Sequence, residues 1–243
     1  MSQGHSPLSQ FEVYPLLPMT LGGADVSFTN ASLWMLIAIV LATSVMMLGV
    51  RKRALVPGRW QSVSELMVEF VSNIVRENAG KEAMRFFPLI FSLFMFILFC
   101  NLAGMLPKSF TVTSHIIVTF AMAACVFIGV TVIGFIQHGL HFFSLFLPKG
   151  TPAWMAPIMV VIEMISYLAR PFSLSIRLAA NMLAGHVLLK ILAGFVVMMG
   201  AFGILPFGFL LIITGFEIFI ACLQAYIFTL LTCIYLHDAI HLH

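Results

Sequence analysis

Long apolar segments separated by short polar ones are the main pattern along this chain. Residues 31–50 contain no charged residue, and at about 1.5 Å per residue a helix of this length matches a hydrocarbon core of about 30 Å. Residues 86–106 and 116–137 are similarly apolar. The pattern therefore predicts three helices that each cross a membrane once, the last two forming a helical hairpin over residues 86–137.

Two later apolar segments are longer than one perpendicular crossing requires. Residues 157–199 would extend over about 65 Å as a single helix, and residues 206–238 are also long for one span. Gly203 and Pro206 predict a turn between them. The first of these segments is expected either to break at Pro171 or to form one strongly tilted helix.

Residues 61–79 are amphipathic rather than uniformly apolar. Hydrophobic side chains recur at helical spacing on one face, and charged or polar side chains occupy the other. Ser62 and Glu65 have the spacing of an N-terminal capping box, and Gly80 is suited to the C-terminal cap. We predict a helix lying on the cytoplasmic membrane surface, although packing against another subunit would give the same pattern.

Composition excludes a soluble protein. The 243 residues are 61% hydrophobic and only 9% charged, whereas soluble domains contain about 25% charged residues. A transmembrane β-barrel would show alternating segments of about 10 residues, which are not found. The sequence predicts an all-α polytopic membrane protein with one membrane domain over residues 1–243. It would contain about five membrane-embedded helices, one amphipathic helix and an external N-terminal segment, residues 1–30.

The distribution of basic residues predicts the orientation in the membrane. Basic residues are retained on the cytoplasmic side. Those expected inside are Arg51, Lys52, Arg53, Arg59, Arg76, Lys81, Arg85 and Lys149, whereas only Lys108 is expected outside. The N-terminus should then lie outside and the C-terminus in the cytoplasm. The four cysteines lie inside apolar segments without metal-ligand spacing, so we expect no metal and no cofactor.

Several polar residues interrupt the long segment 157–199, and they share one helical face. A charge at the bilayer centre costs at least about 2.5–3.5 kcal/mol, so such residues are interpreted as functional. At about 100° per residue, the charged members and Asn181 fall within about 40° of one another. We call this set the polar row; its members are Glu163, Ser166, Arg170, Ser173, Arg177 and Asn181.

Two members of the polar row differ in what would compensate their charge. Arg170 is explained equally well by a buried ion pair with Glu163 and by a functional role. Arg177 is a permanent cation, because arginine is not deprotonated in proteins. Its compensation is expected to come from outside its own helix.

A second polar group spans the two long segments. His186 lies 17 residues before Gly203 and Glu217 lies 14 residues after it. In an antiparallel hairpin these distances place both side chains about 21–26 Å from the turn, at nearly the same depth. Glu217 and Gln224 are seven residues apart and share a helical face. Their side chains are therefore expected to point the same way.

Other functional classes fit these residues less well. A di-haem cytochrome requires facing histidine pairs within the spans, and only His186 lies in the middle of one. A proton-coupled secondary transporter would usually have two related halves, whereas the polar row occurs only in the second half of this chain. This class remains the alternative. No phosphate-binding loop is present, so nucleotide chemistry is not expected, and neither is a nucleic-acid partner.

Three strings resemble subunit a of F-type ATP synthases. They are Arg170-Pro-Phe-Ser-Leu-Ser-Ile-Arg177-Leu-Ala-Ala-Asn181-Met-Leu-Ala-Gly-His186, Glu217-Ile-Phe-Ile-Ala-Cys-Leu-Gln224-Ala-Tyr-Ile-Phe and Asn101-Leu-Ala-Gly-Met-Leu-Pro107. The resemblance extends over essentially the whole chain. It implies that the last two helices form a hairpin lying steeply tilted along a ring of rotor subunits.

The resemblance also implies a function, that of a proton-translocating stator subunit. Two offset half-channels would deliver protons to and from the rotor carboxylates, with Arg177 as the essential arginine between them. By resemblance, Asn181, His186, Glu217 and Gln224 line the outer half-channel and Glu163 lines the cytoplasmic one. Many bacterial members carry Glu at the position of His186 and His at that of Glu217. The exchanged arrangement found here resembles that of mitochondrial members.

The resemblance finally implies partners and a location. The partners would be a rotor ring of small two-helix subunits, the peripheral stalk subunits, the rest of the ATP synthase complex and the lipid bilayer. The chain would not be an enzyme by itself, because the nucleotide chemistry belongs to other subunits. The expected location is the bacterial inner membrane, with the mitochondrial inner membrane as the alternative.

Overall fold

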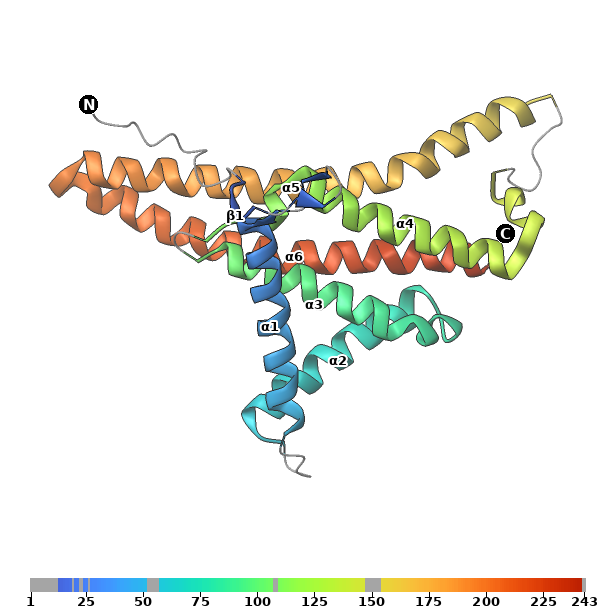
Figure 1. The fold of residues 1–243 in the computed structure, drawn as a ribbon, viewed down its shortest axis with the longest axis horizontal. Helices are drawn as coiled ribbons and strands as arrows, with labels where there is room; N and C mark the ends of the chain where they lie inside the picture. Colours follow the sequence, from blue (N-terminus) through green and yellow to red (C-terminus); the bar gives the residue numbers. More distant parts are fainter. Residues whose placement is uncertain are drawn as a thin grey trace.

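The structure is a computed structural model, and it describes residues 13–18, 20–21, 24–25, 27–51, 57–106, 109–146 and 154–241. Six α-helices dominate these residues (Figure 1). Five of them are long and apolar enough to cross a membrane. The all-α membrane fold is therefore confirmed. Four of the basic residues that predicted the orientation, Lys52, Arg53, Lys108 and Lys149, lie outside the described residues.

The N-terminal region contains short strands that the sequence did not predict. Strand β1 (Pro15–Leu17) pairs antiparallel with β4 (Phe28–Thr29), and β2 (Thr20–Leu21) pairs with β3 (Ala24–Asp25). Thr29 then caps the next helix, since its hydroxyl accepts a hydrogen bond from the Ser32 amide at 3.4 Å. The strands are too short to alter the fold class.

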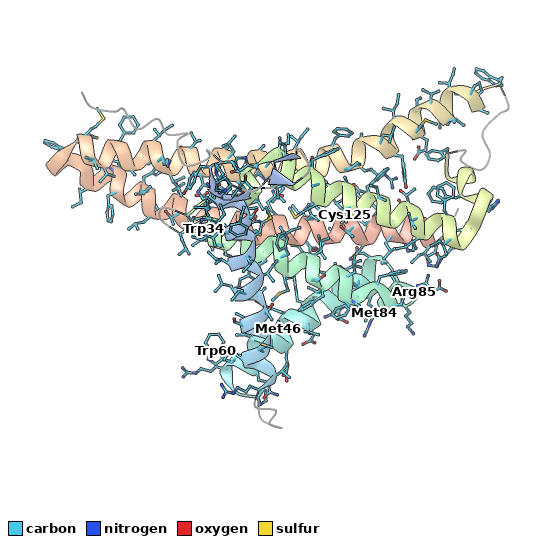
Figure 2. All side chains as sticks on the ribbon, in the orientation of Figure 1. Trp34, Met46, Trp60, Met84, Arg85 and Cys125 are labelled. Carbon is cyan, nitrogen blue, oxygen red and sulfur yellow. The ribbon has the colours of Figure 1, made fainter. Side chains whose placement is uncertain are left out.

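Helix α1 (Asn30–Val50) matches the first predicted span. Trp34 and Trp60 lie near its two ends (Figure 2). Tryptophan is enriched where a membrane meets water, so this placement fits a helix that crosses the bilayer. In Figure 1, α1 stands crosswise to the long pair α5 and α6. A membrane crossed by α1 would therefore contain that pair in a strongly tilted orientation.

Helix α2 (Arg59–Asn78) confirms the predicted amphipathic helix, but it begins two residues earlier. Gly58 is its N-cap, and the Ser62 hydroxyl donates to the Gly58 carbonyl at 3.1 Å, so the proposed capping box is wrong. Gly80 follows the helix with φ of 83°, as expected for a glycine at a helix C-terminus. Part of the apolar face is buried within this chain rather than against lipid, through Val71, Ile74 and Val75.

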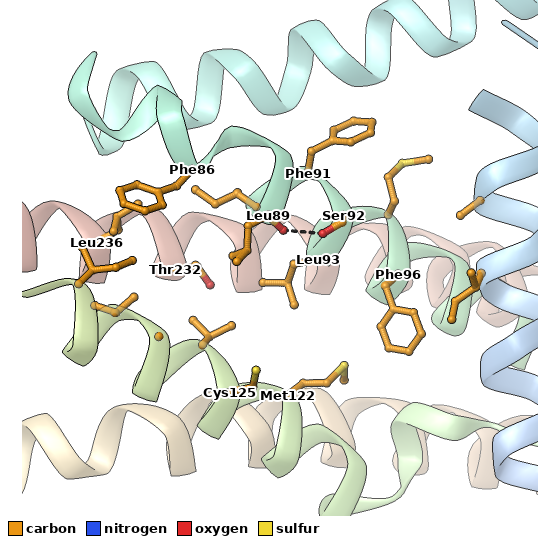
Figure 3. A pocket seen from close by; sticks show the side chains of 18 of the residues that line it. Phe86, Leu89, Phe91, Ser92, Leu93, Phe96, Met122, Cys125, Thr232 and Leu236 are labelled. Atoms are coloured by element: carbon orange, nitrogen blue, oxygen red, sulfur yellow. Dashed lines mark hydrogen bonds between the residues drawn. The ribbon is translucent and has the colours of Figure 1, made fainter. Parts of the chain in front are cut away.

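Helices α3 (Phe87–Gly104) and α4 (Ile116–His138) match the second and third predicted spans. They do not pack on each other as a tight hairpin: α3 packs mainly on α6, and α4 packs mainly on α5. An apolar cavity of about 630 Å³ lies between them, bordered also by α1 and α6 (Figure 3). Phe96, Met122, Cys125 and Leu236 line it, and no charged side chain is found among its described lining residues. The cavity therefore offers no polar path through the membrane.

Helix α5 (Ala156–Met198) is continuous over 43 residues, and α6 (Ile204–Ile240) returns antiparallel to it. Of the two alternatives, one long helix is the correct one. Pro171 lies inside α5, and Figure 1 shows the yellow first part of the helix inclined to its orange second part. A proline within a helix removes one backbone hydrogen bond and commonly produces such a bend without ending the helix.

The turn between α5 and α6 depends on two glycines. Gly200 has φ of 54°, a conformation that side-chain-bearing residues rarely adopt. At Gly203 a Cβ atom would lie 2.5 Å from the Val196 carbonyl oxygen, so the close approach of the chain leaves no room for a side chain. Together they allow two long helices to be joined by the short element η5 (Gly200–Gly203). The predicted turn at Gly203 is confirmed.

Candidate functional site

The hairpin brings His186 and Glu217 into contact. His186 Nδ1 lies 3.5 Å from Glu217 Oε1, and both side chains are more than 90% buried between α5 and α6. The prediction that these two residues lie at nearly the same depth, from the count of residues on either side of Gly203 (the depth count), is therefore confirmed. Gln224 is also buried on α6, two helical turns beyond Glu217. These three residues form a buried polar group inside an otherwise apolar helix pair.

Several atoms of this group have no hydrogen-bond partner among the described residues. They include Nε2 of His186 and both carboxylate oxygens of Glu217. Asn101 on α3 adds another, because its Nδ2 donates to the Ala221 carbonyl at 3.0 Å while its Oδ1 has no partner in the described part of the chain. Buried polar groups are nearly always hydrogen-bonded. This group is therefore suited to binding water and to passing a proton.

Gly185 makes room for the Glu217 carboxylate. A Cβ atom at position 185 would lie 2.7 Å from Glu217 Oε1 and 2.9 Å from Cδ. We expect Gly185→Ala to displace the carboxylate from His186 and to reduce passive proton conduction through the membrane sector by on the order of tenfold, because misplacing a reacting group by about 1 Å is costly.

A matched control for this variant is available on the same helix. A Cβ atom at Gly194 would meet nothing within 4 Å. Gly194→Ala adds the same methyl group and should conduct protons at nearly the unmodified rate. Equal conduction by the two variants would show that the position of the Glu217 carboxylate does not limit proton flow.

Most members of the polar row are exposed on the surface of α5. Arg177 is exposed and forms no ion pair or hydrogen bond with any described residue. The other members are exposed or half-buried: Glu163, Ser166, Arg170, Ser173 and Asn181. Exposed apolar side chains surround the row on α5, among them Ile162, Phe172 and Ile176. A permanent charge within a membrane is costly unless water or an opposite charge compensates it.

The structure places Asn181 and His186 on different faces of α5. Asn181 is exposed, like Arg177 on the polar row, whereas His186 is buried, as are Glu217 and Gln224 on α6. Arg170 does not pair with Glu163. It donates from Nη1 to Oδ2 of Asp238 on α6 at 3.2 Å.

Comparison with known proteins identifies the family. A family model described as ATP synthase A chain matches residues 32–237, which include α1 through α6 almost entirely. The chain belongs to the ATP synthase A chain family. The exposed Arg177 and the contact between His186 and Glu217 are therefore features of a member of this family.

Bacterial relatives of this family member are similar over nearly the whole chain. ATP synthase subunit a of Paramagnetospirillum magneticum is 56% identical, with 98% of this chain and 99% of the relative covered. The subunit from Parvibaculum lavamentivorans is also 56% identical, over 97% of this chain and 93% of the relative. That from Rhodospirillum rubrum is 54% identical, over 98% and 100% respectively.

Asp238, which pairs with Arg170 in this family member, is not among the site residues that the sequence predicts. Asp238 lies 35 residues after Gly203 and Arg170 lies 33 residues before it. The depth count that pairs His186 with Glu217 would therefore also have paired these two.

Proposed function

We propose that this chain is the proton-conducting stator subunit of an F-type ATP synthase in a bacterial membrane. The observation that carries the proposal is Arg177, an exposed permanent cation on the polar row of a membrane helix, without an ion pair in the described structure. A carboxylate on a neighbouring rotor ring would compensate this charge. The partners would be that ring, the peripheral stalk and the remaining ATP synthase complex.

The outer half of the proton path would use the buried group between α5 and α6. His186 and Glu217, 3.5 Å apart, can share a proton, because imidazole and carboxyl groups both donate and accept protons. Gln224 and Asn101 are buried on neighbouring helices and would hold water beside them. A proton would pass along this group and reach the rotor carboxylate at the exposed face, near Asn181.

The inner half would follow the polar row toward Glu163. A protonated rotor site is neutral and can face lipid without the cost of a bare charge. After rotation the site would return beside Arg177, whose charge favours the ionised form of the carboxylate. The proton would then leave toward Glu163 and the cytoplasm. Arg177 would also repel protons that attempt to cross directly from one half to the other.

The energetics agree with such a stepwise device. A charge crossing a potential of about 150 mV releases roughly 3.5 kcal/mol, so several protons are required for each ATP. The chain supplies the path, and the ring would convert successive single crossings into rotation. The long hairpin of α5 and α6 would lie tilted along this ring, because a helix of 43 residues is about twice as long as a perpendicular span.

The proposal is tested by purification and reconstitution. The chain, expressed with its neighbouring subunits, should co-purify with a small apolar ring-forming subunit and with a nucleotide-hydrolysing head. Vesicles containing the complex should acidify on addition of ATP, and vesicles lacking this chain should not. A chain that purifies alone and transports a solute down a proton gradient would instead support a secondary transporter.

The proposed orientation gives a labelling prediction. In a cysteine-free background, a cysteine at exposed Asn73 of α2 should react with a water-soluble maleimide added from the cytoplasmic side. A cysteine at buried Ile74 should not react from either side. Ser64 is unsuitable as a polar probe, because it is buried and its hydroxyl donates to the Val45 carbonyl at 3.2 Å. Labelling of position 73 only from the outside would reverse the whole topology.

A further inference from the structure

Arg170 and Arg177 are two cations on the same face of α5, seven residues apart. Seven residues are about two helical turns, or roughly 10 Å along the axis. Both guanidinium groups are permanently charged. A rotor carboxylate that passes this face would therefore encounter two cations in succession unless one of them is neutralised.

The two arginines differ in the contacts that they make. Arg170 Nη1 lies 3.2 Å from Asp238 Oδ2, and the two side chains are 21% and 27% exposed. Its guanidinium also lies 5.3 Å from the ring centroid of Tyr167 and 4.9 Å from that of Tyr235. These aromatic contacts favour a fixed position for the cation. Arg177 has no ion pair with any residue that the structure describes.

Glu163 does not provide the same neutralisation. It lies seven residues before Arg170 on the polar row, about 10 Å along the helix. Ion pairs within a helix form at spacings of three or four residues. Asp238, which reaches Arg170 from the opposite helix of the hairpin, is therefore the group that compensates it.

We propose that Asp238 is a positioning residue of the proton path: it neutralises Arg170, so that Arg177 alone acts on the passing rotor carboxylate. This inference rests on the proposed stator function. Without Asp238, Arg170 would be a second uncompensated cation, which would hold the carboxylate in its ionised form away from the outer path. In each step of the ring, a rotor carboxylate would then have to be separated from two cations instead of one.

The test compares neutralisation of each partner in the assembled complex. Asp238→Asn is expected to reduce ATP-driven proton pumping about tenfold, the effect of one charge at about 10 Å in a medium with an effective dielectric constant of about 20. Arg170→Gln should retain more pumping than Asp238→Asn, because it removes the extra cation itself. The double variant Arg170→Gln with Asp238→Asn should pump at the level of Arg170→Gln.

If the Arg170–Asp238 ion pair only held α5 and α6 together, the result would be different. Loss of either partner would then be equally harmful, and the double variant would show no recovery relative to Asp238→Asn. That outcome overturns the proposal. Co-purification of the ring and the head with each variant shows whether the complex has assembled.

A second variant tests the same idea without touching the ion pair. Ser173 is exposed on the polar row, one turn before Arg177. Ser173→Lys adds an uncompensated cation and should slow pumping more than Ser173→Gln, which adds similar bulk without charge. Equal pumping by these two variants contradicts the inference, even if Asp238→Asn does not assemble.

The outcome for Arg177 separates this inference from the proposed function. If Arg177→Ala abolishes pumping while Asp238→Asn pumps normally, only the role of Asp238 is wrong. If Arg177→Ala pumps normally, the stator function fails, whatever the variants at Asp238 and Ser173 do.

Discussion

Replacement of Arg177 by alanine is expected to abolish ATP-driven proton pumping while the complex still assembles. The side chain is exposed and forms no ion pair with any described residue, so its loss breaks no ion pair within that part of the chain. Its expected role is to act on a carboxylate of another subunit. Without it, a rotor carboxylate has no cation that favours release of its proton, and the two halves of the path are no longer separated by a positive charge.

Arg177→Lys is also expected to fail. The guanidinium group is planar, permanently charged and weakly hydrated, whereas an ammonium group is compact, strongly hydrated and readily loses its proton when it is buried. A lysine that became neutral beside the ring would no longer repel a proton. Residual pumping by the lysine variant should therefore be small compared with the unmodified complex.

The measurement is acidification of vesicles that contain the reconstituted complex, with ATP hydrolysis recorded in parallel. Arg76→Ala is a matched control, because Arg76 is an exposed arginine on α2 outside the α5–α6 hairpin. It should pump normally. Near-normal pumping by Arg177→Ala would show that this cation is not required, and the proposed mechanism would be wrong.

The helices themselves were largely predictable because one physical effect dominates them. A long uncharged segment has few alternatives in a membrane, since its backbone groups must be hydrogen-bonded internally. The start of α2 was less predictable. Ser62 and Glu65 match a capping box, yet the helix begins at Arg59 with Gly58 as its N-cap. Local signals at a helix end are weak compared with the packing of α2 on its neighbours.

The candidate site was predictable where a simple count was sufficient. A short turn at Gly203 fixes the relative depth of residues on the two long helices, which is why His186 and Glu217 were expected to meet. The count does not give rotation about each helix axis over such lengths, particularly beyond Pro171. Helical periodicity already places Asn181 and His186, five residues apart on α5, about 140° from each other. That His186 is the buried one and Asn181 the exposed one is shown by the structure.

The pairing of Arg170 illustrates a different limit. The sequence suggests Glu163 and Arg170 as partners, because both are charged residues in the same apolar segment. Asp238 lies near the end of α6, where a charged residue is not unusual. Arg170 lies 33 residues before Gly203 and Asp238 lies 35 residues after it, so the two side chains lie at nearly the same distance from the turn and can compensate each other across the hairpin.

The second large effect is expected from exchanging His186 and Glu217. Each residue replaced by alanine should slow proton conduction severely, because the other is then left buried without its partner. His186→Glu alone would place two carboxyl groups about 3.5 Å apart, and Glu217→His alone would place two imidazoles there. Two carboxylates at this distance oppose each other's ionisation, and two imidazoles contain no carboxylate to receive the proton, so each single exchange should also be impaired.

The double exchange, His186→Glu with Glu217→His, restores one carboxyl and one imidazole at the same depth. A proton relay requires a donor and an acceptor in contact, and does not depend on which helix supplies which group. The double variant should therefore conduct more than either single exchange. Passive proton flow through the membrane sector, measured after removal of the catalytic head, reports this step without the rest of the cycle. If the double exchange conducts no better than the worse single one, the two residues do not work as a coupled pair, and the outer path must pass elsewhere.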